Sequence, residues 1–296
     1  MRLKDKTAIV TGAGSGFGKG IAMRFAKEGA RVGVVDINAE AARDVASQIG
    51  NSAFAMEADV SIDRDVSRMV QEALDRWRQL DILVNNAGTT HRNQPMTEVT
   101  EEEYERIFAV NVKSVYLSAR HVVPVMKKQG FGVILNVAST AGVRPRPGLV
   151  WYNTSKGAMI TATKAMAIEL AGEKIRVNAI NPVAGETGML HLFMGEDTPE
   201  KRAQFISSIP LGRLSLPEDM ANAALFLCSD EAEMIKCAQN TMLASRVALA
   251  NILYDACAEY NISYNSIRKI AFDRFEILGP HMVQVPGQDG KRGFGG

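Results

Sequence analysis

The alternation of short apolar runs with segments of helical periodicity is the feature that most restricts how this 296-residue chain can fold. Six runs rich in β-branched residues occur before Pro182: Thr7 to Thr11, Arg31 to Asp36, Ala53 to Asp59, Asp81 to Asn85, Gly132 to Ala138 and Ile175 to Asn181. Between them lie candidate helices near residues 16–28, 39–49, 63–78, 101–128 and 152–171. Because the runs are almost continuously apolar, they predict parallel strands that are covered on both faces by crossover helices. We therefore expect an α/β fold with a doubly wound parallel sheet.

Charge and composition exclude several other classes of protein. The 34 Lys and Arg residues nearly balance the 33 Asp and Glu residues, so the chain has no electrostatic footprint for nucleic acid or for a membrane surface. Its apolar stretches are strand-sized and its first residues form no apolar signal segment, which leads us to expect a cytoplasmic protein. Three cysteines and four histidines, all widely spaced, predict neither a disulfide framework nor a metal site.

A glycine-rich segment follows the first predicted strand. It reads Thr11-Gly12-Ala13-Gly14-Ser15-Gly16-Phe17-Gly18, and the first helix begins near Gly16. Small residues at such a turn let backbone amides approach a pyrophosphate, which the positive end of the helix then stabilises. Asp36 ends the next strand, where its carboxylate can accept both ribose hydroxyls of NAD and would repel the 2′-phosphate of NADP. The pattern favours NAD as cofactor; the alternative is an ordinary tight turn and a surface aspartate.

The wider set of motifs resembles the short-chain dehydrogenase/reductase family over about residues 3–232. In order, the motifs are the glycine segment, Asn85-Asn86-Ala87-Gly88, Ser139, Tyr152-Asn153-Thr154-Ser155-Lys156 and Asn181-Pro182. The resemblance implies a Rossmann fold, a homo-oligomer (a dimer or a tetramer) and a nicotinamide-dependent enzyme. Its substrates would be a small-molecule alcohol and the corresponding ketone.

Tyr152 and Lys156 lie four residues apart and so share one face of a helix. A phenol is a poor general base at neutral pH, and we expect the nearby ammonium to lower its pKa toward the working range. Ser139, at the end of its strand, can donate a hydrogen bond to a substrate carbonyl while Tyr152 transfers the proton. The family resemblance further implies that Lys156 binds the nicotinamide ribose and that Asn111 holds a water that connects Lys156 to solvent. An exposed helical pair is the alternative for Tyr152 and Lys156 alone.

The resemblance also implies which residues bind the cofactor. They are Gly12, Ser15, Gly16, Phe17, Gly18, Asp36, Ile37, Asp59, Val60, Asn85, Ala87, Gly88, Pro182, Val183 and Thr187, together with Tyr152 and Lys156. One departure is Val183, where the family often has glycine, although Thr187 is kept.

The substrate side is less specific in sequence. Candidates on loops are His91, Arg92, Arg144, Arg146 and Trp151. The arginines Arg144 and Arg146 could receive a carboxylate or phosphate, or they could lie on a solvated loop face. An apolar group consists of Met189, Leu190, Leu192, Phe193 and Met194. It could form a lid, or it could be the buried side of a short helix.

The end of the chain departs from the family. Residues 184–216 predict a long excursion with one or two short helices, and Pro217 opens a helix through about Cys228. The last strand usual in the family is not found after this helix. Instead, Ala232 to Thr241 and Gly290 to Gly296 resemble a nucleotide-sugar (UDP-glucose type) dehydrogenase.

That second resemblance implies a long helix carrying active-site residues Lys236 and Asn240, and a nucleophilic cysteine that would follow Gly296. We expect two domains, residues 1–230 and 231–296, joined as a fusion, with the second a helical tail that ends irregularly. With no thiol after Gly296, we expect no nucleotide-sugar oxidation by the tail.

Together these features predict an NAD(H)-dependent oxidoreductase that interconverts a secondary alcohol and a ketone, of 3-oxoacyl or sugar/alcohol type. One alternative is a fusion protein that binds the cofactor but is catalytically impaired. Another is nucleotide-sugar binding through the tail.

Overall fold

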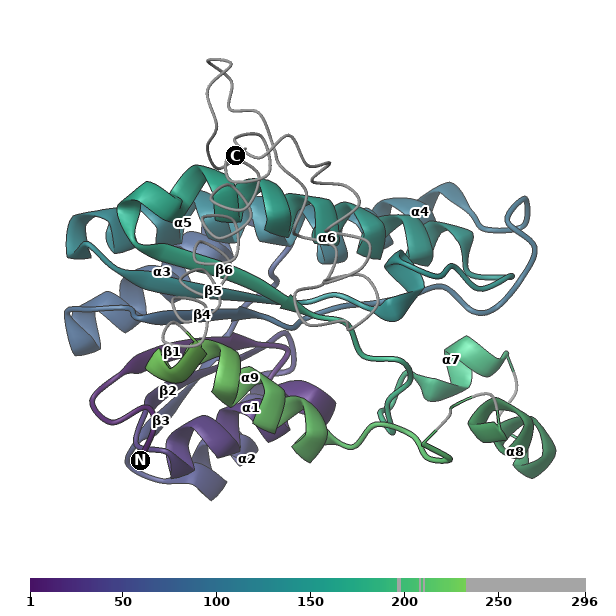
Figure 1. The fold of residues 1–296 in the computed structure, drawn as a ribbon, viewed down its shortest axis with the longest axis horizontal. Helices are drawn as coiled ribbons and strands as arrows, with labels where there is room; N and C mark the ends of the chain where they lie inside the picture. The colour runs from purple at the N-terminus through teal and green to yellow at the C-terminus, as the bar shows by residue number, and fades with distance from the viewer. Residues whose placement is uncertain (196–197, 208, 210, 233–296) are drawn as a thin grey trace, which may run out of the picture. The chain divides into compact units, whose positions relative to one another are not determined.

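A computed structural model of the chain describes residues 1–195, 198–207, 209 and 211–232. It contains a parallel sheet of six strands in the order β3-β2-β1-β4-β5-β6 (Figure 1). The strands are β1 (Thr7–Thr11), β2 (Arg31–Asp36), β3 (Ala53–Glu57), β4 (Ile82–Asn85), β5 (Gly132–Val137) and β6 (Ile175–Ile180). Every neighbouring pair is parallel, and the chain changes direction across the sheet between β1 and β4. The predicted doubly wound Rossmann sheet is confirmed, and β3 ends two residues earlier than expected.

Helices cover both faces of the sheet (Figure 1). The α-helices are α1 (Gly16–Lys27), α2 (Ala39–Ile49), α3 (Asp63–Trp77), α4 (Glu101–Phe108), α5 (Ser114–Gln129), α6 (Val150–Leu170), α7 (Leu190–Met194), α8 (Pro199–Ser207) and α9 (Pro217–Cys228). On one face, Phe25 of α1, Val45 of α2 and Leu225 of α9 pack in a common core with the sheet. On the other, Met69 of α3 and Met126 of α5 do the same. Burial of these large apolar side chains contributes about 1.5–3 kcal/mol each.

The predicted helix over residues 101–128 is divided in the structure. Between α4 and α5 the chain forms a π-helical turn, η1 (Ala109–Lys113), before the α-helix resumes. Asn111 lies in this turn and is fully buried. Such single-turn π segments often occur at functional sites. The apolar spacing of the sequence is the same for a helix with or without this turn, which is why the sequence did not reveal it.

The excursion after β6 contains the two short helices α7 and α8, as expected, and α9 begins at Pro217 and ends at Cys228, as expected. Leu190 of α7, together with Ile209 and Leu214, forms a small apolar cluster separate from the two sheet cores. Residues Met1–Ser229 form one compact unit. The predicted long helix and the residues Lys236 and Asn240 lie outside the described residues.

Candidate active site

The glycine turn connects the end of β1 to the start of α1 at the point where the strand order reverses. Gly12 has a φ of +61°, and a Cβ atom there would lie 2.9 Å from the Cα of Ala87. A Cβ atom at Gly18 would overlap the carbonyl oxygen of Gly12. Asn86 holds the turn from the other side, because its amide nitrogen donates to the carbonyls of Thr11 at 2.8 Å and Gly12 at 3.1 Å. The backbone can therefore approach a ligand closely here.

The amino end of α1 faces a cavity of about 550 Å³, a volume in the range of ligand sites. Ser15, Gly16 and Phe17 line it, so the helix presents its positive dipole end to whatever binds. The Asp36 carboxylate also lines the cavity and is oriented by the turn, since Oδ2 accepts from the Gly14 amide at 2.9 Å and Oδ1 from the Asn38 amide at 3.0 Å. These residues fit a dinucleotide phosphate beside a ribose.

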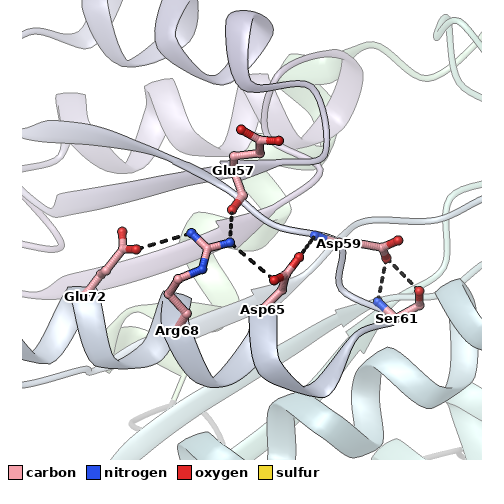
Figure 2. A network of polar contacts seen from close by, with 6 residues as sticks. All are labelled: Glu57, Asp59, Ser61, Asp65, Arg68 and Glu72. Carbon is pink, nitrogen blue, oxygen red and sulfur yellow. Dashed lines mark hydrogen bonds and ion pairs between the residues drawn. The ribbon is translucent and has the colours of Figure 1, made fainter.

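A polar network holds the loop after β3, which carries two further predicted cofactor residues (Figure 2). Arg68 donates to the backbone of β3 at 2.8 Å and forms an ion pair with Asp65 at 3.4 Å. Asp65 accepts from the Asp59 amide at 3.1 Å, and the Asp59 carboxylate accepts from the Ser61 amide and hydroxyl. Asp59 and Val60 line the cavity, so the network fixes this wall.

Ser139 and Tyr152 meet at another part of the cavity. Ser139 lies two residues beyond β5, and its hydroxyl accepts from the Ala141 amide at 3.1 Å and lies 3.4 Å from the carbonyl of Pro182. Tyr152 lies on α6 and makes a side-chain hydrogen bond with Ser139. Both side chains are buried and line the cavity. A carbonyl oxygen placed here could contact both hydroxyls.

Lys156 is also buried and lines the cavity one turn further along α6. Its Nζ donates to the carbonyl of Val137, the last residue of β5, at 2.9 Å. It lies 5.9 Å from the centroid of the Tyr152 ring, over the ring. The predicted common face of Tyr152 and Lys156 is therefore present in the structure.

The pKa values of these two groups are set by burial. Burial raises the pKa of Tyr152 to about 12, and the hydrogen bond with Ser139 opposes this increase. Burial lowers the pKa of Lys156 to about 8. The expectation that the lysine moves the phenol pKa down is wrong for this arrangement, because desolvation outweighs the other effects. At neutral pH the phenol therefore carries its proton.

Asn111 does not line the cavity. Its amide nitrogen donates to the Thr89 carbonyl and to the Ser155 hydroxyl, both at 2.9 Å, and its oxygen accepts from the Thr89 amide at 2.9 Å. A Cβ atom on Gly88 would lie 3.4 Å from both Asn111 Oδ1 and Lys156 Nζ, so these groups flank Gly88. Asn111 therefore joins the β4 loop to α6 beside the lysine.

Most of the other residues predicted to bind the cofactor line the cavity, and two of them do not. Those that line it include Ile37, Ala87, Gly88, Pro182, Val183 and Thr187. Gly18 instead packs against the glycine turn. Asn85 is directed into the sheet, where its amide donates to Asn136 at 2.9 Å, and Asn86 takes its place at the cavity. Because side chains alternate along a strand, the next residue faces the other way.

Of the loop residues predicted to contact the substrate, Arg146 lines the cavity and the others do not. The Arg146 guanidinium lies 4.5 Å from the centroid of the Phe205 ring. Arg144 is exposed on the same loop. His91 is buried and contacts the Arg92 carbonyl through Nδ1 at 2.8 Å, while Arg92 donates to Gly195. Trp151 donates to the carbonyl of Met96.

In the apolar group of residues 189–194, some side chains face the cavity and others form the buried side of a short helix. Met189 and Phe193 line the cavity, and the Phe193 ring lies edge-on to the Tyr152 ring at 5.1 Å. Leu190 is buried in the small cluster of the excursion, with Met194 packed against it. Sequence reasoning missed several lining residues, among them Asn86, Thr89, Arg106, Val110, Leu149 and Phe205. Of these, only Asn86, beside a predicted residue, had a usable signal.

Within the part of the chain that the structure describes, no three or more His, Cys, Asp or Glu side chains gather as metal ligands. Of the helices in the described ranges, none has the length and apolar character to cross a membrane.

A glycine turn at the strand-order reversal and a Ser-Tyr-Lys cluster in the same cavity define a dinucleotide-binding oxidoreductase. The sequence model of the family described as Enoyl-(Acyl carrier protein) reductase matches residues 12–242. The chain belongs to the short-chain dehydrogenase/reductase family and is a short-chain oxidoreductase.

Relatives of known name agree with this assignment. The chain is 51% identical over 239 residues to the 4-formylbenzenesulfonate dehydrogenase TsaC1/TsaC2 of Comamonas testosteroni, covering 79% of this chain and 95% of that protein. It is 40% identical over 243 residues to a sorbitol dehydrogenase of Cereibacter sphaeroides, covering 79% and 94%. Among solved structures, the 3-ketoacyl-(acyl-carrier-protein) reductase from Brucella melitensis complexed with NADH matches with a TM-score of 0.74 at 51% identity, covering 78% of this chain and 94% of that one.

The second resemblance is confirmed at the level of sequence. The central domain of the UDP-glucose/GDP-mannose dehydrogenase family matches residues 230–292. The two family matches overlap at residues 230–242, directly after the end of the compact unit Met1–Ser229.

Proposed function

We propose that the protein interconverts a secondary alcohol and a ketone with NAD(H), using Ser139, Tyr152 and Lys156, with Asn111 as a positioning residue. The observation that carries the proposal is that one cavity joins the glycine turn to the Ser139–Tyr152 pair. The names of the relatives span an aromatic aldehyde sulfonate, a sugar alcohol and an acyl-carrier ketone, which supports the reaction class but does not choose a substrate.

NAD(H), held by the glycine turn and Asp36, would supply the hydride chemistry at the substrate carbon. Ser139 holds the substrate oxygen by a hydrogen bond. In the reduction direction Tyr152, protonated at neutral pH because burial raises its pKa to about 12, gives its proton to that oxygen. In the oxidation direction Tyr152 acts as the base, so it must first lose its own proton before it accepts the proton of the alcohol. Lys156 lies over the tyrosine ring, and its hydrogen bond to Val137 fixes its amine beside the cofactor side of the cavity.

Preference for NAD over NADP is part of the proposal. The Asp36 carboxylate is held by the Gly14 and Asn38 amides at the cavity wall, where it would accept ribose hydroxyls and repel a 2′-phosphate. Titration of the purified chain with NADH and NADPH, followed by fluorescence, should give at least about tenfold tighter binding of NADH. In Asp36→Asn the difference should shrink, and equal affinities in the wild type would refute the preference.

The catalytic roles are tested with a panel of ketones and secondary alcohols. Tyr152→Phe should retain NADH binding and lose about 10²–10⁴-fold in kcat. Tyr116→Phe is the matched control, because Tyr116 is exposed on α5 and should keep full activity. Saturable binding without turnover of any panel member would favour the alternative, a cofactor-binding but catalytically impaired protein.

We also propose that the chain consists of two domains that meet near residue 230, that it assembles as a homo-oligomer and that it is cytoplasmic. The meeting of two family matches at residues 230–242 supports the first point. Truncation after residue 230 followed by light scattering tests the first two: loss of the folded oxidoreductase unit would contradict the division, and a monomeric full chain would contradict the assembly. Cell fractionation tests the location.

A further inference from the structure

One wall of the cavity carries an arginine that lies against an aromatic ring. Arg146, in the loop before α6, places its guanidinium 4.5 Å from the centroid of Phe205 in α8. Both residues line the cavity, and both are half-buried. A guanidinium on an aromatic face keeps the N–H groups at its edge available for a planar oxyanion.

Backbone contacts fix this arginine relative to Tyr152. The Arg146 carbonyl accepts from the side chain of Asn153 at 2.8 Å, and Asn153 is buried on α6 directly after Tyr152. The next residues of the loop are held by Asn93, whose amide nitrogen lies 3.4 Å from the Pro147 carbonyl. The wall is therefore built before a substrate arrives, which reduces the entropy lost on binding.

The surface near Tyr152 is apolar. Tyr152 packs with Ala141 and Leu149 in a small cluster, and Phe193 joins this cluster edge-on to the tyrosine ring at 5.1 Å. Together with Phe205, which contacts the guanidinium, these side chains give the cavity an aromatic and aliphatic lining. Such a lining suits a flat ring better than a polyhydroxylated chain, whose hydroxyls would lose their hydrogen bonds to water.

Among the described residues, none neutralises the charge of Arg146. Within the described ranges, no carboxylate forms an ion pair with its guanidinium, whereas Arg213 of the same excursion is paired with Asp219. In the described part of the chain, the acidic residues that line the cavity are Asp36, the last residue of β2, and Asp59, in the loop after β3. A half-buried, unneutralised guanidinium in an apolar wall is most stable when an anion binds to it.

We propose that Arg146 determines substrate specificity by binding a carboxylate or sulfonate carried on the aromatic ring of the substrate, at the end opposite the reacting carbonyl. This inference rests on the proposed function, and it identifies the substrate class as anionic aromatic carbonyl compounds and the corresponding alcohols.

The experiment compares 4-acetylbenzoate and 4-formylbenzoate with their neutral counterparts, 4-methylacetophenone and 4-methylbenzaldehyde. Turnover with NADH and binding of each probe by calorimetry in the presence of NADH are measured on the full chain. The variants are Arg146→Gln, Arg146→Lys and, as the matched control, Arg144→Gln, which removes the same charge from an exposed position two residues away.

The wild type should bind the anionic probes more tightly than the neutral ones. Arg146→Gln should weaken binding of the anionic probes and raise their KM by about 10- to 100-fold, as for loss of a charge-assisted hydrogen bond, and change the neutral probes less than about twofold. Arg146→Lys should recover part of the loss, and Arg144→Gln should behave as the wild type. Unchanged NADH affinity in each variant shows that the site has folded.

The outcomes separate the inference from the function on which it rests. Turnover of neutral probes with equal or weaker binding of the anionic ones would overturn the role of Arg146 and leave the oxidoreductase intact. An equal loss of affinity for the anionic probes in the Arg144→Gln control would also overturn it, because the net charge of the loop would then explain the effect. Arg146-dependent binding without turnover of any probe would support the inference and contradict the proposed activity.

Discussion

Replacing Lys156 with methionine should increase the free energy of unfolding at neutral pH, even though it removes a residue that we propose acts in catalysis. Lys156 is buried on α6, and burial lowers its pKa to about 8 from an ordinary value of 10.5. Between these two pH values the unfolded chain binds more protons at this position than the folded chain does. The stability contributed by this group therefore rises from pH 8 to pH 10.5, and it is lowest below pH 8, where the folded protein must hold a buried charge.

The size of the effect follows from the gap between the two pKa values. At 1.36 kcal/mol per pKa unit, the gap corresponds to about 3 kcal/mol at pH 7. Methionine also removes the hydrogen bond to the Val137 carbonyl, which costs about 1 kcal/mol. We expect Lys156→Met to be about 2 kcal/mol more stable than the wild type at pH 7, and the advantage to disappear by about pH 10.

Urea unfolding at pH 7, 8, 9 and 10 measures this difference. Trp77 and Trp151 both lie in the compact unit Met1–Ser229 and report its unfolding by fluorescence. Lys164→Met is the matched control, because Lys164 is exposed on the same helix. The reasoning is refuted if Lys156→Met is less stable than the wild type at pH 7, or if the difference between them does not change with pH.

Two other substitutions test the scaffold of the site. In Gly18→Ala the new Cβ would overlap the Gly12 carbonyl, so NADH affinity should fall at least about tenfold and stability by about 1–3 kcal/mol, whereas Gly172→Ala, with open space around it, should change neither. In Arg176→Met the carbonyls of Leu227 and Ser229 at the end of α9 lose their guanidinium donors, and the urea midpoint should drop by the equivalent of about 1–3 kcal/mol. An unchanged midpoint would mean that solvent replaces these bonds without cost.

The sequence was sufficient for the sheet and for most of the residues that line the cavity beside the glycine turn. Strands of a buried parallel sheet are continuous apolar runs, and the glycine turn can only follow the first of them, so Gly12, Ser15 and Asp36 were located by local pattern alone. These are features in which the local sequence and the fold agree.

What the sequence could not supply depends on tertiary packing. The neighbours Asn85 and Asn86 are identical in type, and only the pairing of Asn85 with Asn136 decides which of them faces the cavity. The π-helical turn at Asn111 leaves no trace in the apolar periodicity. The direction of the Tyr152 pKa shift was predicted wrongly, because the spacing of Tyr152 and Lys156 reveals their proximity and not the depth of their burial.

The contacts of Asn93 have a consequence for engineering. Its side chain reaches the carbonyls of Pro147 and Phe193, and its backbone amide donates to Leu192 at 2.9 Å. At Gly148 there is no room for a side chain, because a Cβ atom there would collide with the side-chain amide of Asn93. Three segments distant in the sequence are thus interlocked through one asparagine. Grafting of loops between homologues would therefore have to transfer all three segments together. A chimaera that exchanged only one of them would lose the Asn93 contacts that hold the cavity wall around Arg146.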